Sequence, residues 1–193
     1  MTFPPYPMTA RCIIAPLAAP DELRDRVTAA DWAAAADFSP RRRAEFLTWR
    51  AVVYRELGGV GIAYDPAGAP VLVGDPRHIG VSHAGDRVAV AISDRRCAVD
   101  IEPAGRDFSR AAARFLTPDE AALGDDPLLA GIVWCAKETL FKYAGRPSLR
   151  LLRDLSVEAV DFASGRIAGR ICGGGPFPLR FELREGLIVV HIL

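Results

Sequence analysis

The chain has 193 residues, half of them hydrophobic, and a formal net charge of zero at pH 7. This length allows one large domain or two small ones, each with a substantial core. There is no basic excess and no aromatic pattern typical of RNA-binding motifs, so the composition argues against nucleic-acid binding. Four cysteines are widely separated and predict reduced thiols rather than a zinc site or a disulfide scaffold: Cys12, Cys97, Cys135 and Cys172.

No apolar run approaches the roughly 20 residues that a membrane-spanning helix needs. The first residues also lack the basic segment that opens a signal peptide. We therefore expect a cytoplasmic protein with no membrane partner.

The first third of the chain predicts one strand and two helices. An apolar run from Cys12 to Leu17 is typical of a strand, and the acidic residues after Pro20 indicate a helix that continues through Trp32. Ser39-Pro40 supplies an N-cap and a first-turn proline for the next helix. That helix repeats its apolar residues at spacings of three and four as far as about Leu57, where Gly58-Gly59 ends it.

The middle of the chain predicts four short strands, at residues 71–73, 79–83, 88–92 and 97–101. Gly85-Asp86 and Asp94-Arg95-Arg96 are turns between consecutive strands. We therefore expect an antiparallel meander whose last strand holds two acidic residues, Asp100 and Glu102.

The last third predicts helices followed by strands. Thr117 caps a helix start, and a long helix runs from about Pro127 to Tyr143 before Gly145 closes it. Four strands follow, at residues 157–162, 166–171, 179–183 and 187–192. The element order predicts an α+β fold with two similar halves, 1–96 and 97–193, in a pseudo-two-fold arrangement. Each half would be an antiparallel sheet packed with helices, and no linker separates the two halves.

Asp100 and Glu102 are two residues apart, so on a strand both carboxylates project from one face. A solvated strand face at a sheet edge would explain this pair by itself. However, Val99 and Ile101 would place the opposite face in a core, and two adjacent like charges repel unless a cation neutralises them. Ligands that are all oxygen favour Mg²⁺ or Ca²⁺ over zinc.

Glu138 and Lys142 are four residues apart and share one helix face. In isolation this pair would be a surface ion pair worth a few tenths of a kcal/mol. Together with Asp100 and Glu102, it would form a site for a hard cation and a polyphosphate.

Ser82-His83 ends a strand, where both side chains are either structural or donors to a phosphate. Arg43 and Arg50 are seven residues apart on one face of the second helix. That spacing suits an anionic ligand or an acidic partner, although a solvated helix face is the usual outcome for such a run. The patterns of serine hydrolases, zinc peptidases and P-loop or dinucleotide-binding proteins are all missing.

Together these patterns resemble those of the 4'-phosphopantetheinyl transferase superfamily, in its longer, pseudo-dimeric class. The resemblance covers roughly residues 40 to 160. Four patterns occur in the same order and at similar spacing, whereas any one alone would be weak: Val81-Ser82-His83, Ala98-Val99-Asp100-Ile101-Glu102, the segment 115–120, and Trp134 through Lys142 with Gly145.

The resemblance implies an enzyme that transfers 4'-phosphopantetheine from its co-substrate coenzyme A to a serine of an apo acyl or peptidyl carrier protein, releasing 3',5'-ADP. Asp100, Glu102 and Glu138 would bind Mg²⁺, or Mn²⁺ in its place, together with the pyrophosphate, and Lys142 would contact a phosphate oxygen. The 3'-phosphate would be held by His83 with Arg50 and Arg43, and Ser82 could also donate to a phosphate. Glu138 would take the serine proton directly or through a metal-bound water, and both routes stay open.

The same resemblance implies a monomer with its active site in the cleft between the halves, and an acidic, helical carrier from fatty acid or secondary metabolite biosynthesis. Members often have Gly-Lys-Pro before the Ser-His strand, whereas this chain has Gly68-Ala69-Pro70 and lacks that lysine. This departure keeps open an alternative, a non-catalytic module that binds coenzyme A or a carrier. A Mg²⁺-dependent phosphohydrolase would need a water-positioning residue that the sequence does not indicate.

Overall fold

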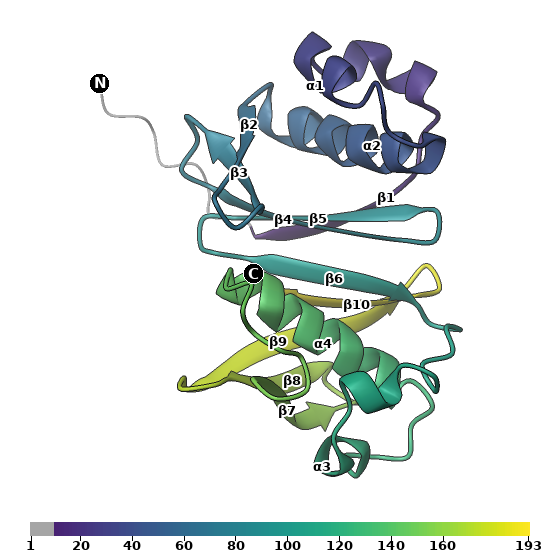
Figure 1. Cartoon of the computed structure of the whole chain (residues 1–193), viewed down its shortest axis with the longest axis vertical. Coiled ribbons are helices and arrows are strands. Elements are labelled where there is room, and N and C mark those ends of the chain that lie inside the picture. The colour runs from purple at the N-terminus through teal and green to yellow at the C-terminus, as the bar shows by residue number, and fades with distance from the viewer. Residues whose placement is uncertain (1–9) are drawn as a thin grey trace.

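The computed structural model describes residues 10–193, which form a mixed α+β fold of antiparallel sheets packed against helices (Figure 1). The first half contains β1 (Arg11–Pro16), the 3-10 helix η1 (Pro20–Arg26), α1 (Ala29–Ala34), α2 (Pro40–Leu57), β2 (Gly61–Tyr64), β3 (Pro70–Val73), β4 (His78–Ala84) and β5 (Arg87–Ser93). The second half contains β6 (Ala98–Pro103), the 3-10 helix η2 (Ala112–Arg114), α3 (Pro118–Ala121), α4 (Leu129–Ala144), β7 (Leu155–Asp161), β8 (Arg166–Ile171), β9 (Pro176–Arg184) and β10 (Leu187–Ile192).

In the first half, a three-stranded antiparallel sheet in the order β1-β5-β4 packs against α2. Trp49 and Val53 of α2 meet Val88 and Val90 of β5 in a buried apolar cluster. On the other side of α2, η1 and α1 form a second cluster around Leu23. The hairpin β2–β3 is a separate two-stranded sheet that lies beside β4.

The single helix expected from Pro20 through Trp32 is wrong, because the segment forms two short helices. Val27 has extended backbone, with φ −130° and ψ 165°, and ends η1. The side chain of Thr28 then accepts a hydrogen bond from the Asp31 backbone N–H, while the Asp31 carboxylate accepts one from the Thr28 N–H. This reciprocal capping box starts a new helix at a position that favours an N-cap over a helix interior.

The helix predicted after Ser39 is confirmed. Ser39 accepts a hydrogen bond from the Arg42 backbone N–H, Pro40 is the first helical residue, and Gly58 ends the helix in a left-handed conformation. Local capping chemistry determines both ends, so the sequence alone predicts this helix.

The expected four-stranded meander is also wrong. β3 pairs with β2, a strand that the sequence reading missed, and only β4 and β5 pair as consecutive strands. β6 leaves this sheet and pairs antiparallel with the last strand, β10, so that Asp100 lies opposite Val190. Strand pairing depends on contacts between distant parts of the chain, which turn residues do not determine.

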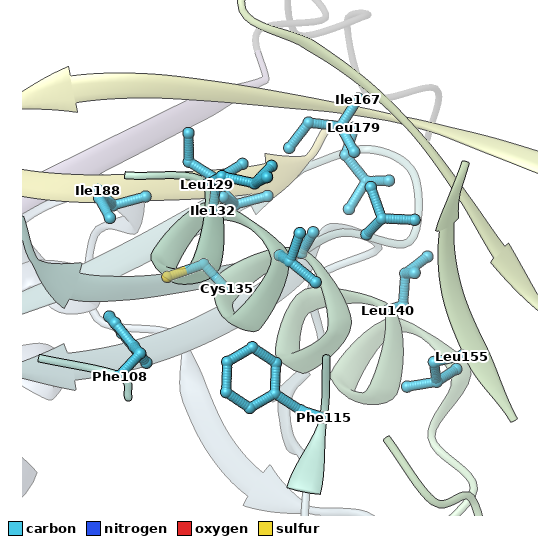
Figure 2. Packing of buried hydrophobic residues seen from close by; sticks show 14 of the residues in the cluster. Phe108, Phe115, Leu129, Ile132, Cys135, Leu140, Leu155, Ile167, Leu179 and Ile188 are labelled. Atoms are coloured by element: carbon cyan, nitrogen blue, oxygen red, sulfur yellow. The ribbon is translucent and has the colours of Figure 1, made fainter. Parts of the chain in front are cut away.

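In the second half, a five-stranded antiparallel sheet in the order β6-β10-β9-β8-β7 curves around α4. Figure 2 shows apolar side chains from α4, the sheet and the preceding loop gathered around this helix. The fully buried residues of this apolar cluster include Phe115, Ile132 and Leu140. α4 also contacts β6, the strand that holds the two acidic residues.

The two halves meet where β6 and β10 face β4 and β5 (Figure 1). Ala89 and Ala91 of β5 share a buried cluster with Val99 and Val189. At Gly80 of β4 the backbones approach so closely that a Cβ atom would lie 3.0 Å from the Ala98 Cα. A side chain at this position would push β4 away from β6.

No helix within residues 10–193 is long and apolar enough to cross a membrane. The placement of the boundary between the halves at residues 96 and 97 stays a prediction.

Candidate active site

The centre of the candidate site is an ion pair between Asp100 and Lys142. The Lys142 Nζ donates to Asp100 Oδ1 at 2.7 Å, and the Ser82 hydroxyl donates to the same oxygen at 2.8 Å. Lys142 also donates to the backbone carbonyl oxygens of Val99 at 3.1 Å and Val81 at 3.4 Å. One amine therefore links α4, β6 and β4, and so both halves of the chain.

The second oxygen of Asp100 has no such partner. Oδ2 is buried and accepts no hydrogen bond from any residue in the range 10–193. Burial, followed by the negative charges of Asp100 and Glu102, raises the pKa of the nearby Cys135 thiol well above its usual range. A thiol is only a weak donor, so it does not replace a proper partner for a buried carboxylate oxygen. A bound cation would supply one.

Glu102 is held by two donors of its own half. The Trp134 indole Nε1 donates to its Oε1 at 3.1 Å, and the Arg106 guanidinium pairs with the same oxygen. Arg106 in turn lies over the rings of Phe108 and Trp134. The second acidic residue of β6 is therefore partly neutralised by a cation from the chain itself.

Glu138, a residue of α4, lies near the carboxylates of Asp100 and Glu102 on β6. Burial and then the negative charge of Asp100 raise its pKa, with Glu102 adding to the rise and Lys142 opposing it. The negative charges of Asp100 and Glu102 therefore repel that of Glu138, and a divalent cation would relieve this repulsion.

The chemistry of these side chains fits a hard cation, since all three offer carboxylate oxygens and Asp100 Oδ2 is unpartnered. As they stand, no three His, Cys, Asp or Glu side chains within residues 10–193 are grouped so that they could hold a metal ion. Glu102 instead faces Arg106 and Trp134. The structure thus brings Asp100 and Lys142 into direct contact and leaves the three-carboxylate ligand set a prediction.

Lys137, the neighbour of Glu138, projects from a different face of α4 and is fully buried. Its Nζ donates to Glu120 Oε2 at 2.8 Å and to the Phe115 carbonyl oxygen at 2.6 Å. Glu120 also accepts from the backbone N–H groups of Thr117 and Val157. This ion pair ties α3 and β7 to α4, so its role is to position the helix that holds Glu138 and Lys142.

His83 is half-exposed at the end of β4. Its Nδ1 lies 3.4 Å from Oε1 of Glu45, a carboxylate on α2 that also accepts from Arg41. His83 follows Ser82 directly, so it projects from the other face of β4 and not toward Asp100. Its role in binding phosphate stays a prediction.

Arg50 and Arg43 have contacts away from Asp100. The Arg50 guanidinium donates to Asp31 at 2.8 Å and to Tyr64 at 2.9 Å, is buried, and stacks on Phe46. The Arg43 guanidinium lies over the Trp32 ring, and its buried Nε has no hydrogen-bond partner within residues 10–193. Phosphate binding by these two arginines stays a prediction, and the structure does not bring them to the Asp100–Lys142 pair.

Asp31 is itself the centre of a polar cluster in the first half. Burial alone would raise its pKa, but hydrogen bonds from Tyr54 and Thr28 and the charge of Arg50 together lower it. The Tyr54 hydroxyl donates to its Oδ2 at 2.6 Å.

Three features of the site were not predicted from the sequence. Arg106 and Trp134 donate to Glu102, and Lys137 is fully buried. Ser82 donates to Asp100. A signal existed for Trp134, because it lies four residues before Glu138 and so shares its helix face. Arg106 is likewise four residues after Glu102. The Ser82–Asp100 contact joins two different sheets, and no local pattern predicts it.

The buried carboxylate of Asp100 thus pairs with Lys142 and lies near two further carboxylates, Glu102 on the same strand and Glu138 on α4. Comparison with known proteins gives the family. Residues 96–187 match the family described as the 4'-phosphopantetheinyl transferase superfamily, so this part of the chain is a domain of that superfamily. The matched range includes Asp100, Glu102, Glu138 and Lys142. A search of curated proteins returned no match.

Proteins of that superfamily transfer phosphopantetheine to carrier proteins and typically use coenzyme A and Mg²⁺.

Proposed function

We propose that this protein transfers the 4'-phosphopantetheine group from coenzyme A to a serine of an apo acyl or peptidyl carrier protein and releases 3',5'-ADP. One observation supports this most strongly. The hydrogen-bonded network of Lys142, Asp100 and Ser82 lies at the junction of the two halves. Asp100 and Lys142 are within the range that matches the superfamily, and Ser82 is outside it. In this proposal the halves are related by a pseudo-two-fold axis and the active site lies in the cleft between them.

In the proposed reaction, the carrier serine oxygen attacks the pyrophosphate phosphorus that bears the pantetheine arm. A new P–O bond forms, and the bond from that phosphorus to the bridging oxygen breaks, so the electron pair leaves with 3',5'-ADP. The Lys142 Nζ has three acceptors, Asp100 and the carbonyl oxygens of Val99 and Val81, so it would release one of them to donate to a phosphate oxygen. Such a cation stabilises the charge that develops on the leaving group.

The serine proton passes to Glu138, directly or through a water molecule. Without a bound cation, burial and the charge of Asp100 raise the pKa of Glu138, whereas a cation held by its carboxylate would oppose that rise. Asp100, Glu102 and Glu138 would hold Mg²⁺ or Mn²⁺, and the ion would neutralise negative charge on the pyrophosphate. Glu102 would have to exchange Arg106 for the ion.

The test is to incubate the protein with coenzyme A, Mg²⁺ and several apo carrier proteins, and to measure the mass of each carrier. We expect one carrier to gain one phosphopantetheine group and 3',5'-ADP to appear in equal amount. Asp100→Asn should abolish the gain while the circular dichroism spectrum stays unchanged. If no carrier gains mass under conditions in which a known transferase modifies it, the proposal is wrong. Tight metal-dependent binding of coenzyme A without product would instead indicate the non-catalytic binding module.

A further inference from the structure

A cavity of about 750 Å³ lies on the face of the five-stranded sheet that is turned away from α4. Side chains alternate between the two faces of a strand, and Ile167 of β8 and Leu179 of β9 belong to the apolar cluster around α4 (Figure 2). Their neighbours Ala168 and Arg180 therefore project from the other face, where they line the cavity. Its volume is within the range of about 300–1,000 Å³ that is usual for small-molecule sites.

This face of the sheet is separate from the candidate active site. β6 pairs with β10 so that Asp100 lies opposite Val190, and His191 lies opposite Val99. Val190 belongs to the cluster around α4, so Asp100 is on the α4 face of the sheet. His191 is on the other face and lines the cavity. A ligand in this cavity would leave the site of the proposed reaction free, so the inference does not rest on the proposed function.

Three basic side chains cross this face in one row, which we call the basic row. Arg166 of β8 lies directly opposite Arg180 of β9, and Arg180 lies directly opposite His191 of β10. Directly opposite residues of antiparallel strands have their Cβ atoms about 4.5–5.5 Å apart, and like charges at such positions destabilise a sheet. An acidic residue at either arginine position would instead form a cross-strand ion pair. The stability of the sheet therefore does not explain why two arginines occupy these positions.

The acidic residues beside the basic row already have partners. Asp161, opposite Arg166 on β7, accepts hydrogen bonds from a serine hydroxyl and from backbone N–H groups of its own turn. These hydrogen bonds lower the pKa of Asp161 more than the charge of Arg166 does. Glu182, two residues after Arg180, pairs with Arg184. Within residues 10–193, neither Arg166 nor Arg180 takes part in an ion pair, and both are exposed at the cavity.

His191 supplies a further hydrogen-bonding group at the end of the basic row. Burial lowers its pKa, which the charge of Glu182 opposes and the charges of Arg180 and Arg184 reinforce. The imidazole is therefore neutral at pH 7 and has one N–H donor. The cavity thus offers two guanidinium groups and one neutral donor on adjacent strands.

We propose that this cavity binds a phosphate monoester. Each guanidinium group is a planar fork of donors, and two of them match the two negative charges and the several oxygens of such a group. The floor beside the basic row consists of small apolar residues that lie opposite one another on three strands: Ala159, Ala168 and Pro178. The phosphate group would lie between Arg166 and Arg180, where it relieves their repulsion, and the organic part of the ligand would lie over this floor.

Phenyl phosphate, a monoester with a compact apolar group, is the probe, and titration calorimetry at low salt measures its affinity for the full chain. We expect it to bind about tenfold tighter than benzoate, which has the same ring and a single charge. Arg166→Ala and Arg180→Ala should each weaken its binding by about 10- to 100-fold, the usual loss for hydrogen bonds to a charged group. In nuclear magnetic resonance spectra, the ring signals of His191 should shift during the titration, whereas the backbone signal of Lys142 should not.

Arg170→Ala is the matched control. Arg170 is on the same strand and the same face as Arg166, but it pairs with Glu158 and does not line the cavity. Its removal changes the net charge equally and should leave the affinity for phenyl phosphate unchanged.

Thermal unfolding distinguishes a binding role of the two arginines from a structural one. Because each alanine variant removes a like-charge contact, the unfolding temperature should stay constant or rise. Arg180→Glu should raise it and abolish binding, since a glutamate opposite Arg166 forms an ion pair and repels phosphate. A lower unfolding temperature in the alanine variants, or unchanged affinity in them, would overturn the proposal. So would equal affinity for benzoate, shifts confined to the signals around Lys142, or no binding of phenyl phosphate to the unmodified protein.

Discussion

Replacing Lys137 by methionine tests the buried ion pair that positions α4. Methionine has a similar length but no charge, so it fills the space of the lysine stem. It leaves the Glu120 carboxylate buried, with only the Thr117 and Val157 backbone N–H groups as donors. The Phe115 carbonyl oxygen also loses its donor.

The loss in free energy of unfolding expected for Lys137→Met follows from the burial of this ion pair. The Lys137 side chain is 0% exposed and that of Glu120 is 3% exposed, so solvent does not screen the remaining charge. Removing one partner of such a pair typically costs about 3–5 kcal/mol. With a urea slope of about 2 kcal/mol per molar, the unfolding midpoint should fall by about 2 M.

Urea unfolding followed by tryptophan fluorescence measures this change, because Trp134 lies one helical turn before Glu138. Glu120→Gln, which leaves the ammonium unneutralised, should cost a comparable amount. The double variant should be less destabilised than the sum of the two, since it leaves no unpaired charge. A loss below about 1 kcal/mol for Lys137→Met, or strict additivity in the double variant, would refute the view that this pair is buried and coupled.

Three further predictions concern other parts of the chain. Asp31→Asn should destabilise the protein by about 1–3 kcal/mol at neutral pH. Because folding lowers the pKa of Asp31, its contribution is present above the unfolded value of about 3.9 and is lost as pH falls through the lower folded value. Urea midpoints of the two proteins should therefore converge on acidification, and a constant gap would contradict this. Gly145→Ala should cost about 1 kcal/mol or more in thermal unfolding, because φ is positive and Arg96 must move, whereas an unchanged stability would refute the close packing. Arg106→Ala should tighten Mn²⁺ binding severalfold, measured by electron paramagnetic resonance, because it frees Glu102; weaker binding would indicate that Arg106 supports the site.

Features that depend on neighbouring residues were predictable. Ser39 and Gly58 determine the ends of α2, and the Thr117–Glu120 capping box starts α3 as expected. Strands β8 and β10 have the predicted bounds, because a glycine with positive φ precedes each of them, Gly165 and Gly186. The same local chemistry misled at Thr28, where a second capping box divides the helix expected from Pro20 through Trp32.

The sequence predicted which residues make up the candidate site, but it did not predict which of their side chains contact one another. Side-chain periodicity placed Asp100 with Glu102, and Glu138 with Lys142, on common faces of their elements. Their approach depends on β6 pairing with β10, which is almost ninety residues away along the chain. It also depends on Gly80, which allows β4 to lie against β6 and so brings Ser82 to Asp100.

The sequence by itself determined which side chains are available for the chemistry, and the order of their patterns indicated the superfamily whose model matches residues 96–187. Only the tertiary structure decided which of them meet. In the folded chain Arg50 pairs with Asp31, and Lys137 is buried against Glu120. Arg96 and Arg146 line a cleft beside Lys142. The physical reason is that caps and periodicity act over a few residues, whereas ion pairing and burial depend on packing between segments that are far apart in the chain.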